Sequence, residues 1–302
     1  MKTVLVITSS YDNVVDYLTT IYGDRCFFFR LDVDRLGDYS FQVNQYGWSI
    51  DNYRNFVTDQ SVYSIYYRKP SFPNFRKYDS HSQQLMKKDI VGLIKGIVGT
   101  FEGKCLTKPY ILEHAENKVY QMYLARKSGF MMPDSLVTNN SRCIRSFCEG
   151  KKSFIKPLGM GKVSFSGYSY AKKVNLIEYK EPIVGLEISP TYFQHAKQKD
   201  YEVKATYICG KYYTVRVDVD RTKKMGLNEE VLSYSTMSLP NEVVEKCNLF
   251  MKNMNLRLGT FHFLVREEEF YFLDINPNGN WLRLENEFGW NLSADIIDYL
   301  CV

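Results

Sequence analysis

The segment Phe270-Tyr-Phe-Leu-Asp-Ile-Asn-Pro-Asn-Gly279 holds residue types that can bind a metal cation. An apolar strand carries Asp274 and Asn276 and stops at Pro277. Alternate residues of a strand point to the same side, so the carboxylate of Asp274 and the amide of Asn276 share one face. Oxygen ligands of this kind hold Mg²⁺ against nucleotide phosphates. The alternative is a plain strand that ends in an Asn-Pro turn, and residues upstream must decide between the two.

A second candidate is the stretch Lys156-Pro-Leu-Gly-Met-Gly-Lys162. A strand from Ser153 to Lys156 is followed here by a loop with Gly159 and Gly161. Glycines let backbone N–H groups approach phosphates closely, and lysines neutralise the phosphate charge. The spacing is not that of a Walker A motif. The alternative is an ordinary flexible hairpin turn.

Two further groups could belong to the same site. Asn117-Lys118 lies inside a helix that we predict over 113–128, closed by Gly129 in the left-handed conformation. A single lysine on a helix is usually solvated. Tyr192-Phe-Gln-His195 reads as a short linker between two lobes, where backbone groups could recognise a base edge and an aromatic ring could pack on the base. The alternative is a plain aromatic strand end.

Strands and helices alternate along the chain in an order that favours an α/β lobe followed by α+β lobes. The pattern predicts a strand over 4–8, a helix capped by Asp12 and ending near Tyr22, and a strand over 26–30. It predicts a strand over 62–68, a long helix over 79–100 and a boundary near 107. Later strands are expected over 184–188, in a hairpin over 201–217 that turns at Cys209-Gly210, and in a hairpin over 259–275. Helices are expected over 241–253 and 293–300.

Composition narrows the class of protein. The 302 residues are 24% charged and 45% hydrophobic, and the net charge is +5, which suits anionic ligands but is far from a nucleic-acid-binding tail. No stretch approaches the roughly 20 apolar residues that span a bilayer, and the N-terminus is too short and strand-like for a signal peptide. Seven scattered cysteines without a Cys-x-x-Cys pair indicate reduced thiols in a cytoplasm, with neither a disulfide framework nor a zinc site. We expect no nucleic-acid or membrane partner.

The order of these groups resembles that of the ATP-grasp ligases over about residues 108–300. The narrower resemblance is to the ATP-grasp peptide maturases that make graspetides, the microviridin-type macrocyclases. The segments that carry it are Ile65-Tyr-Tyr-Arg-Lys69, Glu116-Asn-Lys118 with Gln121, Val137-Thr-Asn139, Asn276-Pro-Asn-Gly-Asn-Trp281 and Leu284-Glu285.

This resemblance implies an ATP-grasp fold of the α+β / α/β class, in which two α+β lobes clasp ATP behind an N-terminal α/β lobe. The expected domains are 1–107, 108–194 and 195–302. It also implies a ligase that phosphorylates Asp or Glu side chains of a ribosomal precursor peptide. The resulting acylphosphate is then joined to a Ser or Thr hydroxyl or a Lys amine. ATP and Mg²⁺, a precursor with a leader sequence, and a possible homodimer are implied as well.

Carried over residue by residue, the resemblance assigns roles to several side chains. Lys118 and Lys156 would neutralise phosphates, and Lys204 would stand where the family often has Arg, without its bidentate fork. Arg216 could meet the γ-phosphate or the acylphosphate, and Arg68 could bind the acidic side chain of the peptide. The remaining expectations are the loop glycines Gly159 and Gly161, the adenine slot Phe193, Gln194 and His195, the Mg²⁺ ligands Asp274 and Asn276, and a peptide pocket near Trp281 and Arg283.

The metal site departs from the family pattern. His262 stands where the family usually has Asp, and Asp274 replaces the usual Glu, so one formal negative charge is missing. His prefers softer metals than Mg²⁺. Three alternatives follow: waters complete the site around a single Mg²⁺, a carboxylate such as Asp218, Asp220 or Glu285 substitutes, or the protein binds nucleotide or peptide without catalysis. Two other functions stay open: a different ATP-grasp carboxylate–amine ligase, and a precursor-binding partner that does not catalyse.

Overall fold

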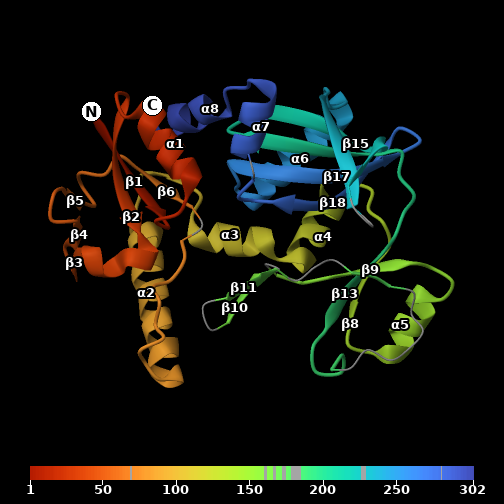
Figure 1. Cartoon of the computed structure of the whole chain (residues 1–302), viewed down its shortest axis with the longest axis horizontal. Coiled ribbons are helices and arrows are strands. Elements are labelled where there is room, and N and C mark those ends of the chain that lie inside the picture. Colours follow the sequence, from red (N-terminus) through yellow and green to blue (C-terminus); the bar gives the residue numbers. More distant parts are fainter. Residues whose placement is uncertain are drawn as a thin grey trace. The chain divides into compact units, whose positions relative to one another are not determined.

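The computed structural model describes residues 1–68, 70–159, 162–165, 168–171, 175–177, 185–225, 229–279 and 281–302, and side chains within 160–184 and 220–231 are left out (Figure 1). The chain forms two compact units. The first contains Met1–Leu112 and Asn280–Val302, and the second contains Glu113–Gly279. The division of 108–302 into a central and a C-terminal subdomain stays a prediction.

The first unit is built on a parallel sheet with the strand order β2-β1-β6-β7. Its strands are β1 (Lys2–Thr8), β2 (Cys26–Asp32), β6 (Ser64–Tyr67) and β7 (Lys104–Leu106). Helix α1 (Asn13–Tyr22) connects β1 to β2, and the Asp12 side chain accepts a hydrogen bond from the Val14 N–H at its start. The strand–helix–strand prediction is confirmed. Parallel strands are covered on both faces, which explains why Val4 to Thr8 form one continuous buried run.

Other elements of the first unit extend this lobe. An antiparallel sheet contains β3 (Ser40–Asn44), β4 (Gly47–Asp51) and β5 (Phe56–Thr58). A 3₁₀ helix, η1, covers Val33–Asp38. Helix α2 spans Ser80–Thr100, which confirms the predicted long helix, and Asp79 is its N-cap.

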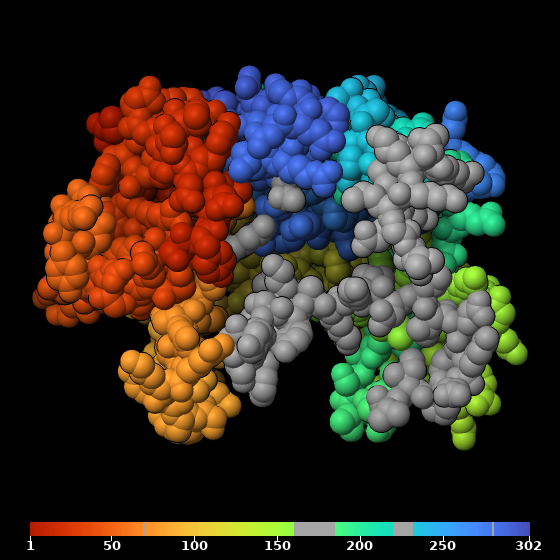
Figure 2. Space-filling view, viewed as in Figure 1, coloured from red at the N-terminus to blue at the C-terminus, as the bar shows by residue number. Residues whose placement is uncertain are grey.

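The end of the chain belongs to the first unit. Helices α7 (Trp281–Phe288) and α8 (Leu292–Cys301) carry the contacts. Buried Glu285 accepts hydrogen bonds from the Ser293 backbone N–H at 2.6 Å and from the Tyr17 hydroxyl at 2.7 Å. In Figure 2 the blue surface of these helices borders the red surface of the N-terminal lobe. A carboxylate at the first turn of a helix satisfies its free N–H groups, so Glu285 joins α1, α7 and α8.

The second unit contains a four-stranded sheet and a five-stranded sheet. The smaller has the order β12-β9-β13-β8. Ile144 and Cys148 of α5 (Ser141–Cys148) pack with Leu186 and with Phe193 of this sheet. Its strands are β8 (Ser135–Thr138), β9 (Ser153–Lys156), β12 (Asn175–Ile177) and β13 (Thr191–His195). Strands β10 (Lys162–Phe165) and β11 (Tyr168–Ala171) form a separate hairpin.

The larger sheet of the second unit is antiparallel, with the order β16-β15-β14-β17-β18. Its strands are β14 (Tyr201–Ile208), β15 (Lys211–Met225), β16 (Glu229–Thr236), β17 (Leu258–Arg266) and β18 (Glu269–Asn276). Both predicted hairpins are confirmed. Phe250 of α6 (Asn241–Met254) and Phe130 pack against Phe261, Phe263 and Phe272 on one face, with ring centroids 5.4–6.4 Å from that of Phe130. The opposite face of this sheet carries the polar residues.

Three predictions about local structure are wrong. The helix expected over 113–128 is two helices, α3 (Pro109–Glu116) and α4 (Lys118–Lys127). Asn117 breaks the run because its side chain accepts hydrogen bonds from the Val119 and Tyr120 N–H groups, which is the role of an N-cap. Residues 185–188 form turns where a strand was expected, residue 184 being outside the described part. The expected linker 192–195 is the inside of strand β13.

Among the helices of the described ranges, none is long and apolar enough to cross a membrane.

Candidate active site

Strand register places three of the predicted site residues in one row. Lys204 of β14 lies opposite His262 of β17, and His262 lies opposite Asp274 of β18. Residues directly opposite each other in an antiparallel sheet point to the same face. Lys204, His262 and Asp274 therefore share the polar face. The next row, Val203, Phe263 and Phe272, points into the core.

A β-bulge directly follows this row. After the pair His262 and Asp274, the register resumes with Phe263 opposite Phe272, so Leu273 is an extra residue in β18. A bulge adds twist and redirects the side chains next to it. The bulge thus lies next to Asp274 near the end of β18, and His262 and Asp274 form a cross-strand pair.

Asp274 is the electrostatic centre of this face. Its Oδ1 lies 2.8 Å from His262 Nδ1, and its Oδ2 accepts a hydrogen bond from Lys118 Nζ at 3.0 Å. Burial alone would raise the pKa of the Asp274 carboxyl. The hydrogen bond from His262 and the charges of His262, Lys118 and Lys156 outweigh burial and hold the pKa of Asp274 well below its usual range. Asp274 is therefore a carboxylate at neutral pH.

Lys118 reaches Asp274 because of where α4 begins. Asn117 caps the helix, so Lys118 is its first residue. Its backbone N–H donates to Leu158 O at 2.9 Å, which ties the helix start to the loop after β9. The sequence placed Lys118 within a helix, and the cap moves it to a helix N-terminus, where the helix dipole favours anions.

Lys156 is the last residue of β9 and precedes the loop that contacts the start of α4. Its Nζ donates to Gln194 Oε1 at 2.7 Å. Burial lowers the pKa of Lys156, the Asp274 charge acts to raise it and the Lys118 charge acts to lower it, so the three groups are electrostatic neighbours. Within the described part of the chain, no atom lies within 4 Å of the position that a side chain on Gly159 would occupy. Gly161 lies outside the described residues.

The predicted adenine slot is only partly assembled. Lys156 and Tyr192 are cross-strand partners and Gln194 is two residues from Tyr192, so these three share one face of the smaller sheet. Phe193 and His195 point to the other face. Phe193 is fully buried under α5, and the His195 ring stacks on Phe147 at 4.0 Å. Tyr192 is also buried, and its hydroxyl accepts a hydrogen bond from Gln194 Nε2 at 2.9 Å. Of the proposed slot residues, Gln194 alone accompanies Lys156.

Arg216 lies on the other side of the large sheet from Asp274. It is the cross-strand partner of Val203, which belongs to the core row. Its guanidinium binds both carboxylate oxygens of Asp218, at 2.7 and 2.8 Å, and stacks over the Tyr201 ring at 3.9 Å from the centroid. The structure therefore does not bring Arg216 to the Asp274 face. A sequence pattern fixes alternation within one strand but not which residues face each other across strands.

Arg68 lies in the first unit, at the end of β6, and is buried with a side chain 5% exposed. Its Nε is 3.0 Å from Asp12 Oδ2, although the angle between them is not that of a hydrogen bond. The Asp12 carboxylate is itself the helix cap of α1 and accepts from the Thr8 hydroxyl at 2.9 Å. Arg68 thus has a carboxylate neighbour, Asp12, within the protein, and its role toward an acidic peptide side chain stays a prediction.

The carboxylates considered as substitutes are engaged elsewhere. Asp218 is bound by Arg216, and Glu285 is buried in the first unit, where it caps α8. The side chain of Asp220 is outside the described part. No cluster of three or more His, Cys, Asp or Glu side chains within the described ranges could hold a metal.

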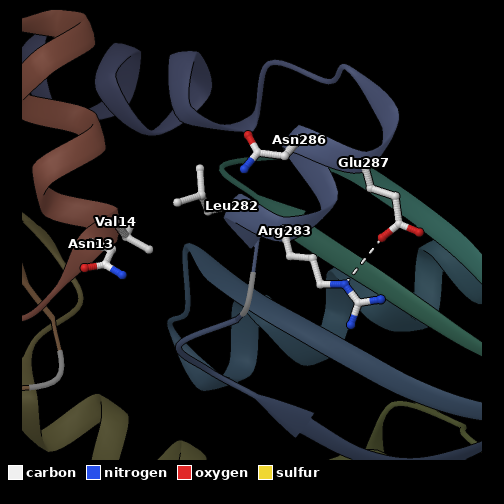
Figure 3. A pocket seen from close by; sticks show the side chains of 6 residues that line it. All are labelled: Asn13, Val14, Leu282, Arg283, Asn286 and Glu287. Atoms are coloured by element: carbon white, nitrogen blue, oxygen red, sulfur yellow. Dashed lines mark hydrogen bonds and ion pairs between the residues drawn. The ribbon is translucent and has the colours of Figure 1, made fainter.

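Trp281 and Arg283 were expected to shape a peptide pocket. Trp281 is fully buried in the first unit. Arg283 is exposed and lies at the rim of a cavity of about 580 Å³, where its Nε is 3.4 Å from Glu287 Oε2 (Figure 3). The figure shows α7 on one side of this cavity and α1 on the other. The lining residues are Asn13, Val14, Leu282, Arg283, Asn286 and Glu287.

The donor set on the polar face fits Mg²⁺ bound together with phosphates. Mg²⁺ usually takes one or two carboxylates from the protein and completes its shell with phosphate oxygens and water. Asp274 supplies a carboxylate. Asn276 is exposed, and its Oδ1 accepts from the Asn278 N–H at 3.1 Å while keeping a second lone pair. His262 uses Nδ1 for Asp274, so only Nε2 could reach a metal.

One residue of this site was missed as a functional candidate. Gln121 lies three positions after Lys118 on α4 and is 1% exposed. Residues three apart on a helix share a face, so the spacing from Lys118 was a signal that could have identified it.

Comparisons with known proteins give a clear answer only at the level of structure. A scan against models of protein families finds no match, and a search of curated proteins finds none either. Solved structures match almost the whole chain. The macrocyclase MdnC of Microcystis aeruginosa, bound with precursor peptide MdnA, has a TM-score of 0.86 and 22% identity over 99% of this chain and 98% of that one.

Two other solved structures place the fold more broadly. A RiPP-associated ATP-grasp ligase of Chryseobacterium gregarium, in complex with ADP and a leader and core peptide, has a TM-score of 0.84 and 20% identity, covering 100% of this chain and 97% of that one. D-alanyl-alanine synthetase A of Vibrio cholerae has a TM-score of 0.63 and 11% identity, covering 99% of this chain and 97% of that one. At these identities the shared property is the course of the backbone, and the chain therefore has the ATP-grasp fold.

Proposed function

We propose that this protein is an ATP-dependent macrocyclase that links Asp or Glu side chains of a ribosomal precursor peptide to Ser or Thr hydroxyls or Lys amines. The main supporting observation is that Lys118 binds Asp274 through its side chain and Leu158 O through its backbone N–H, which brings the start of α4, the strand β18 and the loop after Lys156 together. The likeness over full length to a macrocyclase and to a RiPP-associated ATP-grasp ligase supports the choice of a peptide substrate.

Phosphoryl transfer requires positioning and charge neutralisation more than covalent participation by the protein. The two ammonium groups of Lys118 and Lys156 suit the phosphates of ATP. Asp274 and Asn276 would hold Mg²⁺, which would screen the charge between the phosphates. Gln194, beside Lys156, would approach the nucleotide through its amide. Lys204, on the row of His262 and Asp274, adds a third ammonium to that face.

The reaction proceeds in two steps. A carboxylate oxygen of the peptide attacks the γ-phosphorus, and the bond from that phosphorus to the β–γ bridging oxygen breaks, which releases ADP. The hydroxyl oxygen or amine nitrogen of the same peptide then attacks the acyl carbon, and inorganic phosphate leaves as the nucleophile loses its proton. Each ester or amide link therefore removes one water from the peptide and consumes one ATP.

The partner we propose is an acidic precursor peptide with a leader sequence, which the net charge of +5 would attract. All seven cysteines, each in the described part of the chain, are free thiols, which supports a cytoplasmic location. A homodimer is part of the proposal on the basis of the family resemblance alone.

A second candidate function is precursor or nucleotide binding without catalysis. The occupation of Asp274 by both His262 and Lys118 favours it, because a metal must compete with an ammonium group already in place. The two candidates share nucleotide binding and differ in turnover.

Incubation with ATP, Mg²⁺ and candidate precursor peptides, followed by mass spectrometry and phosphate measurement, separates these functions. We expect the loss of one water and the release of one phosphate per link. A gain of mass would indicate ligation of a second molecule, and nucleotide binding without phosphate release would support the non-catalytic candidate. The variant Lys156→Ala should lose ADP binding while Lys127→Ala, at an exposed lysine of α4, should retain it. Unaltered ADP affinity in Lys156→Ala would remove the loop after β9 from the site.

A further inference from the structure

Gln121 is a buried amide in the second turn of α4. The side chain is 1% exposed, so each of its polar atoms needs a partner inside the protein. A carboxamide offers two N–H donors and an acceptor oxygen with two lone pairs, so it can serve several neighbours at once. All of its partners lie at the predicted site.

The amide of Gln121 holds the backbone of Ile275 at both polar groups. Its Nε2 donates to Ile275 O at 3.0 Å, and its Oε1 accepts from the Ile275 N–H at 3.2 Å. β18 is the last strand of its sheet, and an edge strand leaves alternate N–H and C=O groups unpaired. Gln121 satisfies one such pair as a neighbouring strand would.

Ile275 lies between the two proposed metal ligands, Asp274 and Asn276. Fixing its N–H and C=O therefore fixes the peptide planes that carry both ligand side chains. The same amide reaches the phosphate side of the site. Lys118 Nζ lies 3.4 Å from Gln121 Oε1, and Gln121 Nε2 also donates to Ala115 O at the end of α3, at 2.5 Å.

We propose that Gln121 is a positioning residue that fixes the Asp274–Asn276 strand end relative to Lys118, so that Mg²⁺ and the phosphates of one nucleotide are held together. This inference rests on the proposed function, because it assumes that the polar face binds a nucleotide with its metal. Gln121 touches neither the metal nor the phosphates. It acts through the backbone of β18 and through the ammonium of Lys118.

The chemistry explains why the residue is an amide. Met at this position would fill nearly the same volume and leave the Ile275 N–H and C=O buried without partners, which is costly. Glu would keep an acceptor for the Ile275 N–H and for Lys118, and it would lose the donors to Ile275 O and Ala115 O. The series Gln121, Gln121→Glu and Gln121→Met therefore removes the contacts in steps.

The experiment is calorimetry of ADP binding, with and without Mg²⁺, to the whole protein and to Gln121→Met and Gln121→Glu. We expect the metal-free affinity to change little, because Lys156 and the loop after β9 remain. The gain in ADP affinity on adding Mg²⁺ should fall by about tenfold or more in Gln121→Met, the loss typical when the support of a metal ligand is removed. Gln121→Glu should fall between Gln121→Met and the wild type.

Phe250→Leu is the matched control, because Phe250 packs in the core of the same unit, on the face away from Asp274. It should lower thermal stability without changing the Mg²⁺ effect. Hydrogen exchange of the Ile275 amide supplies a second measurement, independent of metal and nucleotide, and it should be faster in Gln121→Glu and Gln121→Met.

An unchanged Mg²⁺ effect in both variants overturns the inference. So does an equal loss in Phe250→Leu, since general destabilisation would then account for it. A wild-type protein that binds no ADP at millimolar Mg²⁺ overturns the proposed function itself, and this outcome is visible before any variant is made.

Discussion

We expect that the nucleotide-free wild type does not bind Mg²⁺ and that the variant Lys118→Met does. In the structure the ammonium of Lys118 lies 3.0 Å from Asp274 Oδ2, and the side chains are 16% and 23% exposed. The positive charge thus stands beside the carboxylate that a metal needs. We expect Mg²⁺ to bind Asp274 only after phosphates have drawn Lys118 away, and the substitution removes that requirement.

The magnitude follows from the burial of the pair. Removing one partner of a fully buried ion pair costs about 3–5 kcal/mol. Asp274 and Lys118 keep some contact with water, and the Asp274 carboxylate keeps its hydrogen bond with His262, so about 2 kcal/mol is a fair expectation for Lys118→Met. For a unit of this size, such a loss lowers Tm by about 4–8 °C. Mg²⁺ at about 10 mM, against a Kd of about 1 mM, would return about 1.4 kcal/mol.

Thermal unfolding of both proteins, with and without Mg²⁺ and in the absence of nucleotide, tests this reasoning. Tm should rise with Mg²⁺ in Lys118→Met by about 3–6 °C and should stay constant in the wild type. Lys118→Arg keeps the charge and should behave as the wild type, and Lys127→Met should do so as well. Ca²⁺ and NaCl at matched ionic strength separate a bound metal from screening.

The refuting result is specific. If Mg²⁺ alone stabilises the wild type as much as it stabilises Lys118→Met, the ammonium does not compete with the metal. If Mg²⁺ stabilises neither protein, Asp274 does not bind a metal without phosphates even when its charge is unpaired.

Three further results are expected. Arg68→Met should destabilise the nucleotide-free protein by about 3–5 kcal/mol in denaturant unfolding, because it leaves the buried carboxylate of Asp12 unpaired, while ADP affinity should not change. Arg216→Met should alter ADP affinity in the presence of Mg²⁺ by less than about twofold by calorimetry, because register puts Arg216 on the other face from Asp274; a large loss would show that register argument to be wrong. Burial lowers the pKa of Lys156, so its charge opposes folding below that pKa, and this cost disappears as the pH rises toward the unfolded value of about 10.4. The Tm of the wild type should therefore rise relative to that of Lys156→Met on going from about pH 8 to about pH 10, and a difference that does not change with pH would contradict this.

Elements with strong local signals could be predicted from the sequence. The hairpin that turns at Cys209-Gly210 was expected over 201–217 and is confirmed, because Gly210 has a positive φ that a tight turn requires and the flanking strands are β-branched and aromatic. Asp12 and Asp79 were assigned to helix starts and both cap their helices. In each case a few neighbouring residues decide the structure.

The remaining features depend on contacts between distant residues. Asn117 is a residue type that often caps helices, but apolar residues at helical spacing continue on both sides of it. The sequence therefore did not reveal the break between α3 and α4. Phe193 and Gln194 are adjacent and equally compatible with a binding slot. Only the pairing of β13 with β9 shows that Gln194 points toward Lys156 and that Phe193 enters the core.

Arg68 was chosen because an arginine at a strand end suits a carboxylate, and Arg216 was carried over from the family resemblance as a partner of the γ-phosphate or the acylphosphate. Each has a carboxylate partner within the protein, Asp218 and Asp12 respectively. Asp12 lies 56 positions from Arg68 in the chain, since 68 − 12 = 56, and no spacing rule joins them. The parallel pairing of β1 with β6 brings them together.

We expect the histidine at position 262, where the family resemblance predicts Asp, to change the nucleotide-free site more than the affinity of the site for phosphates. Two carboxylates at 262 and 274 would face each other across the β17–β18 pair, and like charges directly opposite destabilise a sheet. His262 replaces that repulsion with a hydrogen bond of 2.8 Å and leaves Asp274 Oδ2 as the oxygen shared with Lys118. If the proposed function holds, a metal that binds together with phosphates would have to displace the ammonium group of Lys118, which the phosphates would attract. With one carboxylate beside the ammonium groups of Lys118, Lys156 and Lys204, the nucleotide-free site is positively charged, and a metal–nucleotide complex of net negative charge would bring it toward neutrality.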